Sequence, residues 1–156
     1  MSGSDDPRGR LRELGLELTE APAPAAAYLP SRAGGGLVFT AGQLPVVDGE
    51  LPRTGRVGED LTTEDGAELA RRAALNVLAV ASAAADGDLT RVRVVKLTVF
   101  VASGERFAEQ HLVANGASEL LAEVLGDRGR HARSAVGVAW LPLNSPVEVE
   151  AVLELT

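Results

Sequence analysis

The sequence contains no cysteine, which excludes several kinds of site at once. Without a thiol there is no cysteine nucleophile, no thiolate zinc site, no cysteine-ligated iron–sulfur cluster and no disulfide framework. Histidine is nearly as scarce, because only His111 and His131 occur, and their separation matches no zinc-binding motif of the HExxH type. We therefore expect no metal site, in a protein that suits a reducing, cytoplasmic compartment.

Aromatic side chains make up only 3% of the residues, and the 15 Lys and Arg are outnumbered by 22 Asp and Glu, for a net charge of −7. An acidic chain with few rings on which bases could stack is a poor nucleic-acid binder, and anionic membranes are disfavoured for the same electrostatic reason. No apolar run approaches the ~20 residues that span a bilayer, and residues 1–10 are too polar for a signal peptide. We expect neither a nucleic-acid partner nor a membrane partner.

The chain has 156 residues, a common length for one compact domain. Residues 1–20 predict a loose lead-in with one short helical turn, over residues 11–14, ended by Gly15. Residues 21–156 predict a single folded domain. No internal repeat, low-complexity tract or linker divides it.

The domain is expected to open with β structure and to continue with a helix. A glycine turn at residues 34–36, a strand over 37–41 and a hairpin signal at 48–49 predict the β opening. From Thr62, which heads a capping-box pattern, apolar residues recur at helical spacing up to about residue 86. This pattern predicts an amphipathic helix of about six turns.

The second half predicts a strand, a second helix and two final strands. Residues 92–101 alternate as a half-buried strand does, and Ser103 is expected to cap a helix that Gly126 ends. Residues 134–141 and 147–155 then predict two strands joined as an antiparallel hairpin, the last with a clear two-residue period.

The resulting order, β-β-α-β-α-β-β, predicts an α+β protein with one mixed sheet and both helices packed on one face. The opposite face would then be bare. Its side chains would be too apolar to remain in water, whether they are Val136, Val138 and Trp140 or Ala135, Gly137 and Ala139. We therefore expect this face to bind other copies of the chain.

Two charged residues near the last strands give the strongest chemical signal. Arg133 stands where a loop enters a strand, and its guanidinium can bind a small carboxylate through two parallel hydrogen bonds, although a surface arginine is the alternative. Glu148 can orient a water or pass a proton, although a solvated strand glutamate is the alternative. A symmetric hairpin places the two residues roughly 20 Å apart at ~3.3 Å per residue. A site that uses both must therefore join two subunits.

Three further positions are candidates for a binding site. Gly42, directly after a strand, lets its own backbone and that of Ala41 approach a ligand, although a plain strand-ending turn is the alternative. Tyr28 can place a phenol over a pocket or cover the edge of the core. Asn115 and Gly116 lie inside a helix, where glycine costs about 1 kcal/mol, so the pair indicates close packing or an amide aimed at a partner.

With these residues in place, the chain resembles the RidA family, which is also called YjgF-like or reactive intermediate deaminase and was formerly called endoribonuclease L-PSP. The resemblance runs from about residue 23 to residue 155. It is carried by Tyr28, TAGQLP at 40–45, KLTVFV at 96–101, Asn115, ARS at 132–134, LP at 141–142 and VEVE at 147–150. The spacing from Arg133 through the Leu-Pro pair to Glu148 is its most specific element.

The resemblance implies a chorismate-mutase-like subunit that forms a homotrimer with sites in the clefts between subunits. It implies hydrolysis of small 2-imino acids, or their enamine tautomers, to 2-keto acids and ammonia, without metal or cofactor. By the same resemblance, Arg133 holds the substrate carboxylate and Glu148 positions the attacking water. Gly42 contacts the imine or the product oxygen, and Tyr28 and Asn115 line the cleft.

Several positions depart from the family pattern. Ala41 stands where active members often carry serine and Ala135 where many carry cysteine, so by the resemblance both alanines contact the substrate in a pocket that lacks this hydroxyl and this thiol. Gly137 stands where glutamate is commoner. Residues 55–60 and 111–120 indicate a longer, less characterised branch. The alternative is therefore a non-catalytic trimer that binds small carboxylates as a sensor or scavenger. A ribonuclease, which the older family name suggests, fits this acidic, aromatic-poor sequence badly.

Overall fold

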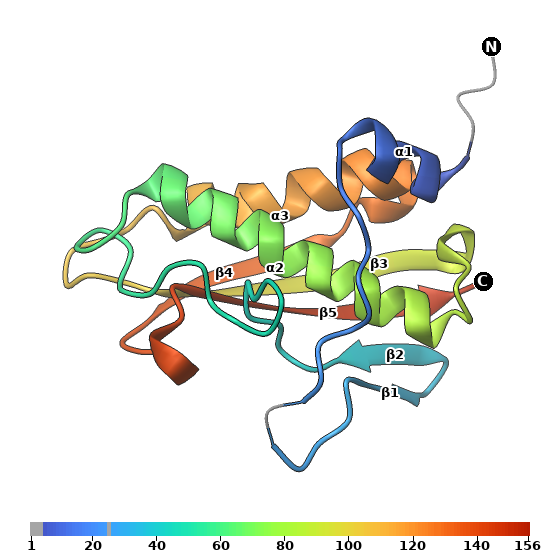
Figure 1. Cartoon of the computed structure of the whole chain (residues 1–156), viewed down its shortest axis with the longest axis horizontal. Helices are drawn as coiled ribbons and strands as arrows, with labels where there is room; N and C mark the ends of the chain where they lie inside the picture. The colour runs from blue at the N-terminus through green and yellow to red at the C-terminus, as the bar shows by residue number, and fades with distance from the viewer. Residues whose placement is uncertain (1–4, 25) are drawn as a thin grey trace.

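One mixed sheet with two long helices on one of its faces makes up the protein (Figure 1), in a computed structural model that describes residues 5–24 and 26–156. Five strands follow the order β1-β2-β5-β3-β4 across the sheet. In chain order the elements are α1 (Pro7–Glu13), β1 (Ser31–Gly34), β2 (Leu37–Thr40), α2 (Thr63–Ala84), η1 (Leu89–Arg91), β3 (Val92–Ala102), α3 (Gln110–Leu125), η2 (Gly126–Gly129), β4 (Ala132–Val138), η3 (Pro142–Asn144) and β5 (Val147–Leu155). This arrangement confirms the predicted α+β class and the mixed sheet.

The helix α2 begins where its sequence predicts. The Thr62 hydroxyl accepts a hydrogen bond from the Asp65 amide at 3.1 Å, and the Asp65 carboxylate accepts one from the Thr62 amide at 3.0 Å, so the capping box is formed. The chain leaves the helix at Gly87, whose φ of 87° favours glycine. Local sequence alone therefore sets both ends of this helix.

The helix α3 begins later than the sequence predicts. Its first residue is Gln110, and Glu109 at the N-cap makes no capping bond with its side chain. The expectation that Ser103 caps this helix is wrong, because Ser103 is buried and its hydroxyl donates to the Val101 carbonyl at 2.8 Å. Gly126 ends the helix with a φ of 63°, as predicted.

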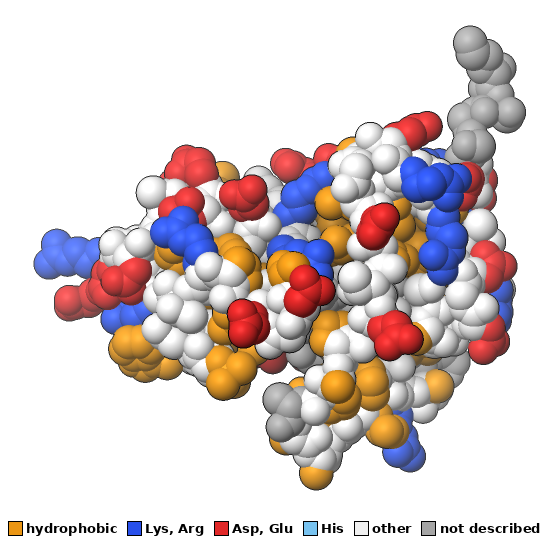
Figure 2. Space-filling view, viewed as in Figure 1, with side chains coloured by type: hydrophobic (Ala, Val, Ile, Leu, Met, Phe, Trp, Pro, Cys, Tyr) orange, Lys and Arg blue, Asp and Glu red, His pale blue; other side chains and the backbone are white. Residues whose placement is uncertain are grey.

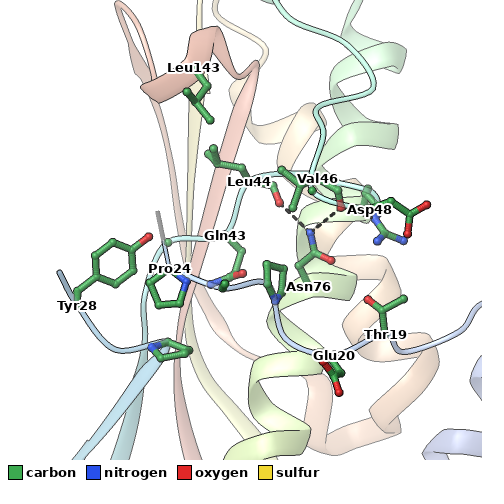
Figure 3. A pocket seen from close by; sticks show the side chains of 16 residues that line it. Thr19, Glu20, Pro24, Tyr28, Gln43, Leu44, Val46, Asp48, Asn76 and Leu143 are labelled. Carbon is green, nitrogen blue, oxygen red and sulfur yellow. Dashed lines mark hydrogen bonds between the residues drawn. The ribbon is translucent and has the colours of Figure 1, made fainter. Parts of the chain in front are cut away.

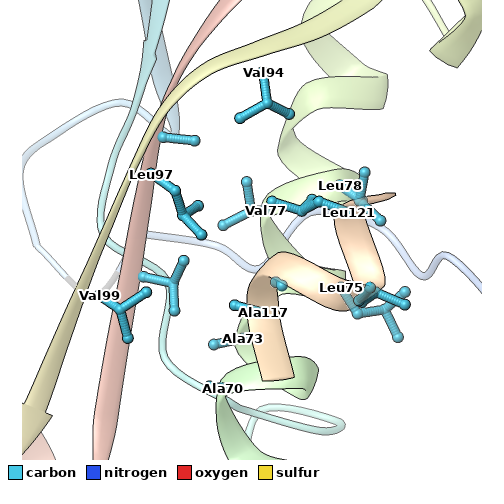
Figure 4. Close-up of a cluster of buried hydrophobic side chains, with 14 of the residues drawn as sticks. Ala70, Ala73, Leu75, Val77, Leu78, Val94, Leu97, Val99, Ala117 and Leu121 are labelled. Carbon is cyan, nitrogen blue, oxygen red and sulfur yellow. The ribbon is translucent and has the colours of Figure 1, made fainter. Parts of the chain in front are cut away.

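The hydrophobic core lies between the sheet and the two helices (Figure 4). Its members come from both layers, with Val94, Leu97 and Val99 from β3 and Ala73, Val77, Leu78, Ala117 and Leu121 from the helices. Fully burying one valine or leucine contributes about 1.5–3 kcal/mol, so this layer holds the helices on the sheet. Alternate residues of β5 point into the same core, as its two-residue period predicts.

The last two strands do not form the predicted hairpin. β4 pairs with β3 in parallel, and β5 pairs antiparallel with both β2 and β3, so β3 separates β4 from β5. The cause is α3, because a strand followed by a helix on the sheet face and a second strand returns the chain to a parallel neighbour. The segment 139–146 then carries the chain past β3 to the start of β5.

The β opening also differs in detail. β1 pairs antiparallel with β2 around a turn at residues 35–36, where φ is 60° and 80°. The sequence predicted the turn and the second strand but not β1. The turn at residues 48–49 closes only one bridge, between Val47 and Glu50, because Pro52 follows at once and lacks the N–H that a longer ladder requires.

The predicted loose lead-in over residues 1–20 carries more structure than one turn. Within its described part, Leu11 of α1 is only 3% exposed, and the Arg10 guanidinium donates to the Val124 carbonyl of α3 at 2.9 Å. Arg128 holds the Asp5 carboxylate with two bonds of 2.7 and 2.8 Å. This segment is attached to the helical layer, and the boundary between it and a domain over 21–156 stays a prediction.

The face of the sheet away from α2 and α3 carries exposed apolar side chains. Paired strand residues point to the same face, so Val136, beside Phe100, belongs to this open face, whereas Ala135, beside buried Val99, faces the helices. Phe39 and Val136 are 47% and 43% exposed. Figure 2 shows mixed charges over the helices, and hydrophobic side chains gathered along the lower edge around β1 and η3. Association through the open face stays a prediction.

Candidate functional site

Arg133 lies in the edge strand β4 with its guanidinium against α3. It pairs with buried Leu97 and therefore points to the helix face of the sheet. Its Nη1 donates to the Asn115 side-chain oxygen at 3.0 Å and to the Ser118 hydroxyl at 3.1 Å, and its Nη2 donates to the His111 carbonyl at 3.1 Å. These bonds hold a half-buried cation in one orientation at the edge of the sheet.

The pair of Asn115 and Gly116 has both roles that the sequence left open: close helix packing, and an amide that contacts a partner residue. A Cβ at Gly116 would overlap the Ala67 backbone oxygen of α2, so the close approach of the two helices requires glycine there. The neighbouring Asn115 turns its amide oxygen to Arg133. One short segment of α3 thus sets the helix packing and orients the arginine.

Ser118 and His131 extend the contacts of Arg133. The His131 ring contacts the Gly129 carbonyl through Nδ1 at 2.6 Å and the Ser118 hydroxyl through Nε2 at 2.9 Å. A carbonyl only accepts, so Nδ1 carries the proton, and in the neutral ring Nε2 accepts from Ser118. Burial lowers the pKa of His131, the Gly129 contact opposes that shift, and the charge of Arg133 adds to it. Burial and the nearby guanidinium therefore both favour the neutral ring.

Glu148 lies on the open face of β5, beside Phe100 of β3. Burial raises the pKa of its carboxyl, and the neighbouring Glu150 raises it further. A carboxylate whose pKa is raised toward neutrality is a better general base than a solvated one. Its environment suits a residue that accepts a proton from water.

Gly42 lies directly against Glu148. A Cβ at position 42 would overlap the Glu148 carboxylate, so only glycine leaves room for this side chain. The adjacent Gln43 exchanges two backbone hydrogen bonds with Val149, of 2.7 and 3.0 Å, which fix the loop beside β5. The close backbone approach predicted for Gly42 is therefore made to Glu148.

The loop that carries Gly42 is held from the other side by α2. The Asn76 amide donates to the Leu44 and Val46 carbonyls at 2.8 and 3.1 Å (Figure 3), and the Arg72 guanidinium donates to the Val46 carbonyl at 3.0 Å. Asn76 is 1% exposed, so these bonds satisfy a buried amide inside the helix. The helix thereby sets the height of the loop above the sheet.

A cavity of about 570 Å³ opens beside this loop (Figure 3), and its walls include both Gly42 and Tyr28. Tyr28 is 48% exposed, so it covers the cavity from the solvent side rather than the core. Apolar residues form much of the remaining wall, among them Pro24, Leu44, Val46 and Leu143. Of the two interpretations of Tyr28, the one that places it at a pocket agrees with this position.

The structure divides the predicted site residues into two groups. Arg133 and Asn115 meet on the helix face, whereas Glu148 and Gly42 meet on the open face with Tyr28 nearby. The two charged residues are two strands apart and three positions out of register, which places their Cα atoms about 14 Å apart. They do not meet in one chain. That expectation is met, although the hairpin from which it was argued is wrong.

The two alanines that replace polar family residues lie in different groups. The Ala41 amide donates to the Pro30 carbonyl at 2.8 Å, so this one backbone group of the loop is already bonded within the chain. Ala135 lies two residues beyond Arg133 on the same strand face and packs against the core. Their roles as substrate contacts stay predictions.

Sequence reasoning missed Ser118, His131 and Asn76 as members of the site. Ser118 lies one helical turn after Asn115, a spacing that places both on one side of α3 and could have identified it. His131 and Asn76 gave no such signal, because their partners come from other elements. Among residues 5–24 and 26–156, no group of three or more His, Asp or Glu is placed to hold a metal ion.

Comparison with known proteins identifies the family of the chain. The family model of endoribonuclease L-PSP matches residues 18–155. Protein TCP17 of Trypanosoma cruzi is 49% identical over 93% of this chain and 91% of its own, and the 2-iminobutanoate/2-iminopropanoate deaminase of Salmonella typhimurium is 35% identical over 85% and 90%. The chain therefore belongs to the endoribonuclease L-PSP family, the RidA or YjgF-like family that the sequence resembles.

Solved structures lead to the same family. A protein of unknown function from Agrobacterium tumefaciens is 48% identical with a TM-score of 0.90, covering 96% of this chain and 92% of that one. The YjgF gene product of E. coli is 30% identical with a TM-score of 0.63, covering 85% and 91%. No helix in the described part of the chain combines the length and the apolar character that crossing a bilayer requires.

Proposed function

We propose that the protein hydrolyses small 2-imino acids, or their enamine tautomers, to 2-keto acids and ammonia. The observation that carries this proposal is the fixed guanidinium of Arg133, held by Asn115 and Ser118 at the sheet edge. An arginine oriented by such neighbours is a receptor for a small carboxylate. A relative with 35% identity bears the name of this deaminase activity, which supports the choice of reaction.

The reaction needs only a bound carboxylate, a positioned water and a base. The substrate carboxylate binds Arg133, which places the imine carbon in the cleft, and Glu148 takes a proton from the attacking water. As the carbon–oxygen bond forms at the imine carbon, Glu148 gives this proton to the imine nitrogen, and a carbinolamine with one hydroxyl and one amine group results. Glu148 then takes the hydroxyl proton and passes it to the amine nitrogen, so the carbon–nitrogen bond breaks, the carbonyl of the 2-keto acid forms and ammonia leaves. The raised pKa of the Glu148 carboxyl suits both transfers.

The complete site is proposed to form between copies of the chain in a homotrimer. Arg133 and Glu148 lie on opposite faces of one sheet, so a single chain cannot offer both to one small substrate. Exposed Phe39 and Val136 on the open face supply apolar surface for association. Cyclic symmetry would place the Arg133 group of one subunit against the Glu148 group of its neighbour. A cytoplasmic location belongs to the same proposal.

The test couples the protein to an amino-acid dehydratase that generates 2-iminobutanoate. Added wild-type protein should accelerate release of ammonia and 2-ketobutyrate, and Arg133→Ala should abolish the acceleration. The matched control is Arg130→Ala, which removes an arginine that is 81% exposed and lies close by in the sequence. An unchanged rate with wild-type protein would refute the deaminase proposal.

A non-catalytic trimer that binds small carboxylates is the second candidate. Ala41 and Ala135 favour it, because the serine and cysteine common in active members are missing. Calorimetry with 2-ketobutyrate or benzoate would then show binding that depends on Arg133, while the coupled assay shows no turnover. A relative named putative regulator AldR, 30% identical, bears a name that is compatible with such a role.

A further inference from the structure

The guanidinium of Arg133 has five N–H donors, and three of them are used within the chain. Both hydrogens of Nη1 are taken, by Asn115 and Ser118, and one hydrogen of Nη2 is taken by the His111 carbonyl. Nε–H and the second Nη2 hydrogen have no partner among the described residues. Nε and Nη2 share the edge of the planar group that faces away from Nη1, the nitrogen held by Asn115 and Ser118. That edge can hold the two oxygens of one carboxylate.

The Ser118 hydroxyl accepts a hydrogen bond from Arg133 when its own hydrogen is directed away from the guanidinium. His131 directs it, because His131 Nε2 accepts the hydrogen bond from the Ser118 hydroxyl at 2.9 Å, and His131 Nδ1–H donates to the Gly129 carbonyl at 2.6 Å. The hydrogen bonds therefore all run in one donor-to-acceptor direction: Arg133 donates to Ser118, Ser118 donates to His131, and His131 donates to the Gly129 carbonyl. Each member is half-buried and comes from a different segment, β4, α3 and the turn before β4.

We propose that Ser118 and His131 are positioning residues that lock the Arg133 guanidinium, so that a substrate carboxylate binds side-on to its Nε–H and outer Nη2–H. This inference rests on the proposed function, because it specifies how that site receives its carboxylate. Without Ser118, one Nη1 hydrogen has no partner and the group turns about its last bonds. Asn115 and the His111 carbonyl then hold it less firmly, and the free edge no longer faces the cleft in one orientation.

The first experiment measures the Kd of 2-ketobutyrate by calorimetry and the steady-state constants in the coupled assay. Ser118→Ala and His131→Asn should each raise the Kd and KM about tenfold, as expected for loss of one bond to a charged group, with kcat almost unchanged. Two conservative variants should bind within about twofold of wild type. Ser118→Thr keeps the hydroxyl that bonds to Arg133, and His131→Gln places an amide oxygen near the position of Nε2, where it can accept from Ser118.

Two controls separate positioning from general damage. The double variant Ser118→Ala with His131→Asn should bind no more weakly than Ser118→Ala alone, because both changes break the same chain of bonds. Glu119→Ala, at the exposed neighbouring position of α3, should bind like wild type. Wild-type binding by Ser118→Ala, or a failure of His131→Gln to restore binding, would overturn the proposal.

The second experiment needs no ligand and keeps the two proposals distinguishable. In protein labelled with ¹⁵N-arginine, the Arg133 signals, assigned with Arg133→Lys, should show hindered guanidinium rotation in wild type and in His131→Gln. Rotation should become free in Ser118→Ala and His131→Asn. If wild type neither binds nor turns over the acid, the proposed function fails, and this spectrum still decides the positioning role. Free rotation in wild type would overturn that role.

Discussion

The Glu148 carboxylate occupies the space that a side chain on Gly42 would need. Because the backbone at position 42 is not in the left-handed region, Gly42→Ala should fold and should displace Glu148. Displacing the proposed general base can cost about 100-fold in rate. We expect kcat/KM in the coupled assay to fall by about that factor. Gly34→Ala, where a Cβ meets open space, is the control, and near-normal activity of Gly42→Ala would contradict the role of Glu148.

The acid side of the pH–rate profile should depend on Glu150. Burial raises the pKa of Glu148 most, and Glu150 raises it further. The base must be ionised, so activity is lost as the pH falls through this raised pKa. Glu150→Gln removes one repelling charge, lowers the pKa of Glu148 and should move the acid limb of kcat/KM to lower pH. Glu154→Gln, farther along β5, is the control, and an unmoved limb would argue against Glu148 as the titrating base.

Stability should fall on acidification because of His131. Its folded pKa lies below the ordinary value of 6.5, so the unfolded chain binds a proton first as the pH falls. The contribution is therefore fully present above pH 6.5 and is lost between that value and the lower folded pKa. Urea unfolding at pH 7.5 and pH 5.5, at fixed protein concentration, should show a smaller loss for His131→Gln than for wild type. Equal losses in both proteins would contradict the assignment.

The contact of α2 with α3 should not tolerate a methyl group at Gly116. A Cβ there would overlap the Ala67 backbone oxygen, and a backbone atom cannot move as a side-chain end does. Gly116→Ala should lower the free energy of unfolding by about 1–3 kcal/mol, despite the better helix propensity of alanine. Urea denaturation measures the change, with the exposed Glu119→Ala as the matched control. A more stable Gly116→Ala protein would show that the helices can separate at little cost.

Association should require the open face of the sheet. Wild-type protein should sediment with the mass of three chains, and Val136→Glu should sediment as one chain and lose activity, because a buried unpaired carboxylate disrupts an apolar contact. Leu14→Glu is a matched control, since Leu14 is 40% exposed, close to the 43% of Val136, but lies at the end of α1. If wild-type protein sediments with the mass of one chain, the proposed site between subunits is excluded.

The sequence predicted local features well where neighbouring residues determine them. The capping box of Thr62 and Asp65, the glycine stop at Gly126 and the alternation of β5 are all present in the structure. Arg133 and Glu148 were identified from residue type and spacing, and the family that this spacing indicated is the one to which the chain belongs. The roles of these two residues in imine hydrolysis stay predictions.

Strand pairing was predicted less well, since two-residue alternation marks a strand without naming its neighbour. The final two strands look like a hairpin in the sequence because they follow each other closely. In the structure β3 lies between them, because α3 returns β4 to a parallel position beside β3. The contact of Gly42 with Glu148 follows from this sheet order and from the bridge between Gln43 and Val149.

By itself, the amino-acid sequence determined the two long helices, the capping box of α2, the glycine stop of α3, the apolar faces of β3 and β5, and the kind of chemistry that one arginine and one glutamate could support. Those properties depend on residues a few positions apart. Only the tertiary structure decided that Arg133 is held by Asn115 and Ser118, with His131 bonded to Ser118, while Glu148 lies on the opposite face beside Gly42. Such contacts join distant segments, and their geometry is set by sheet order and helix packing together.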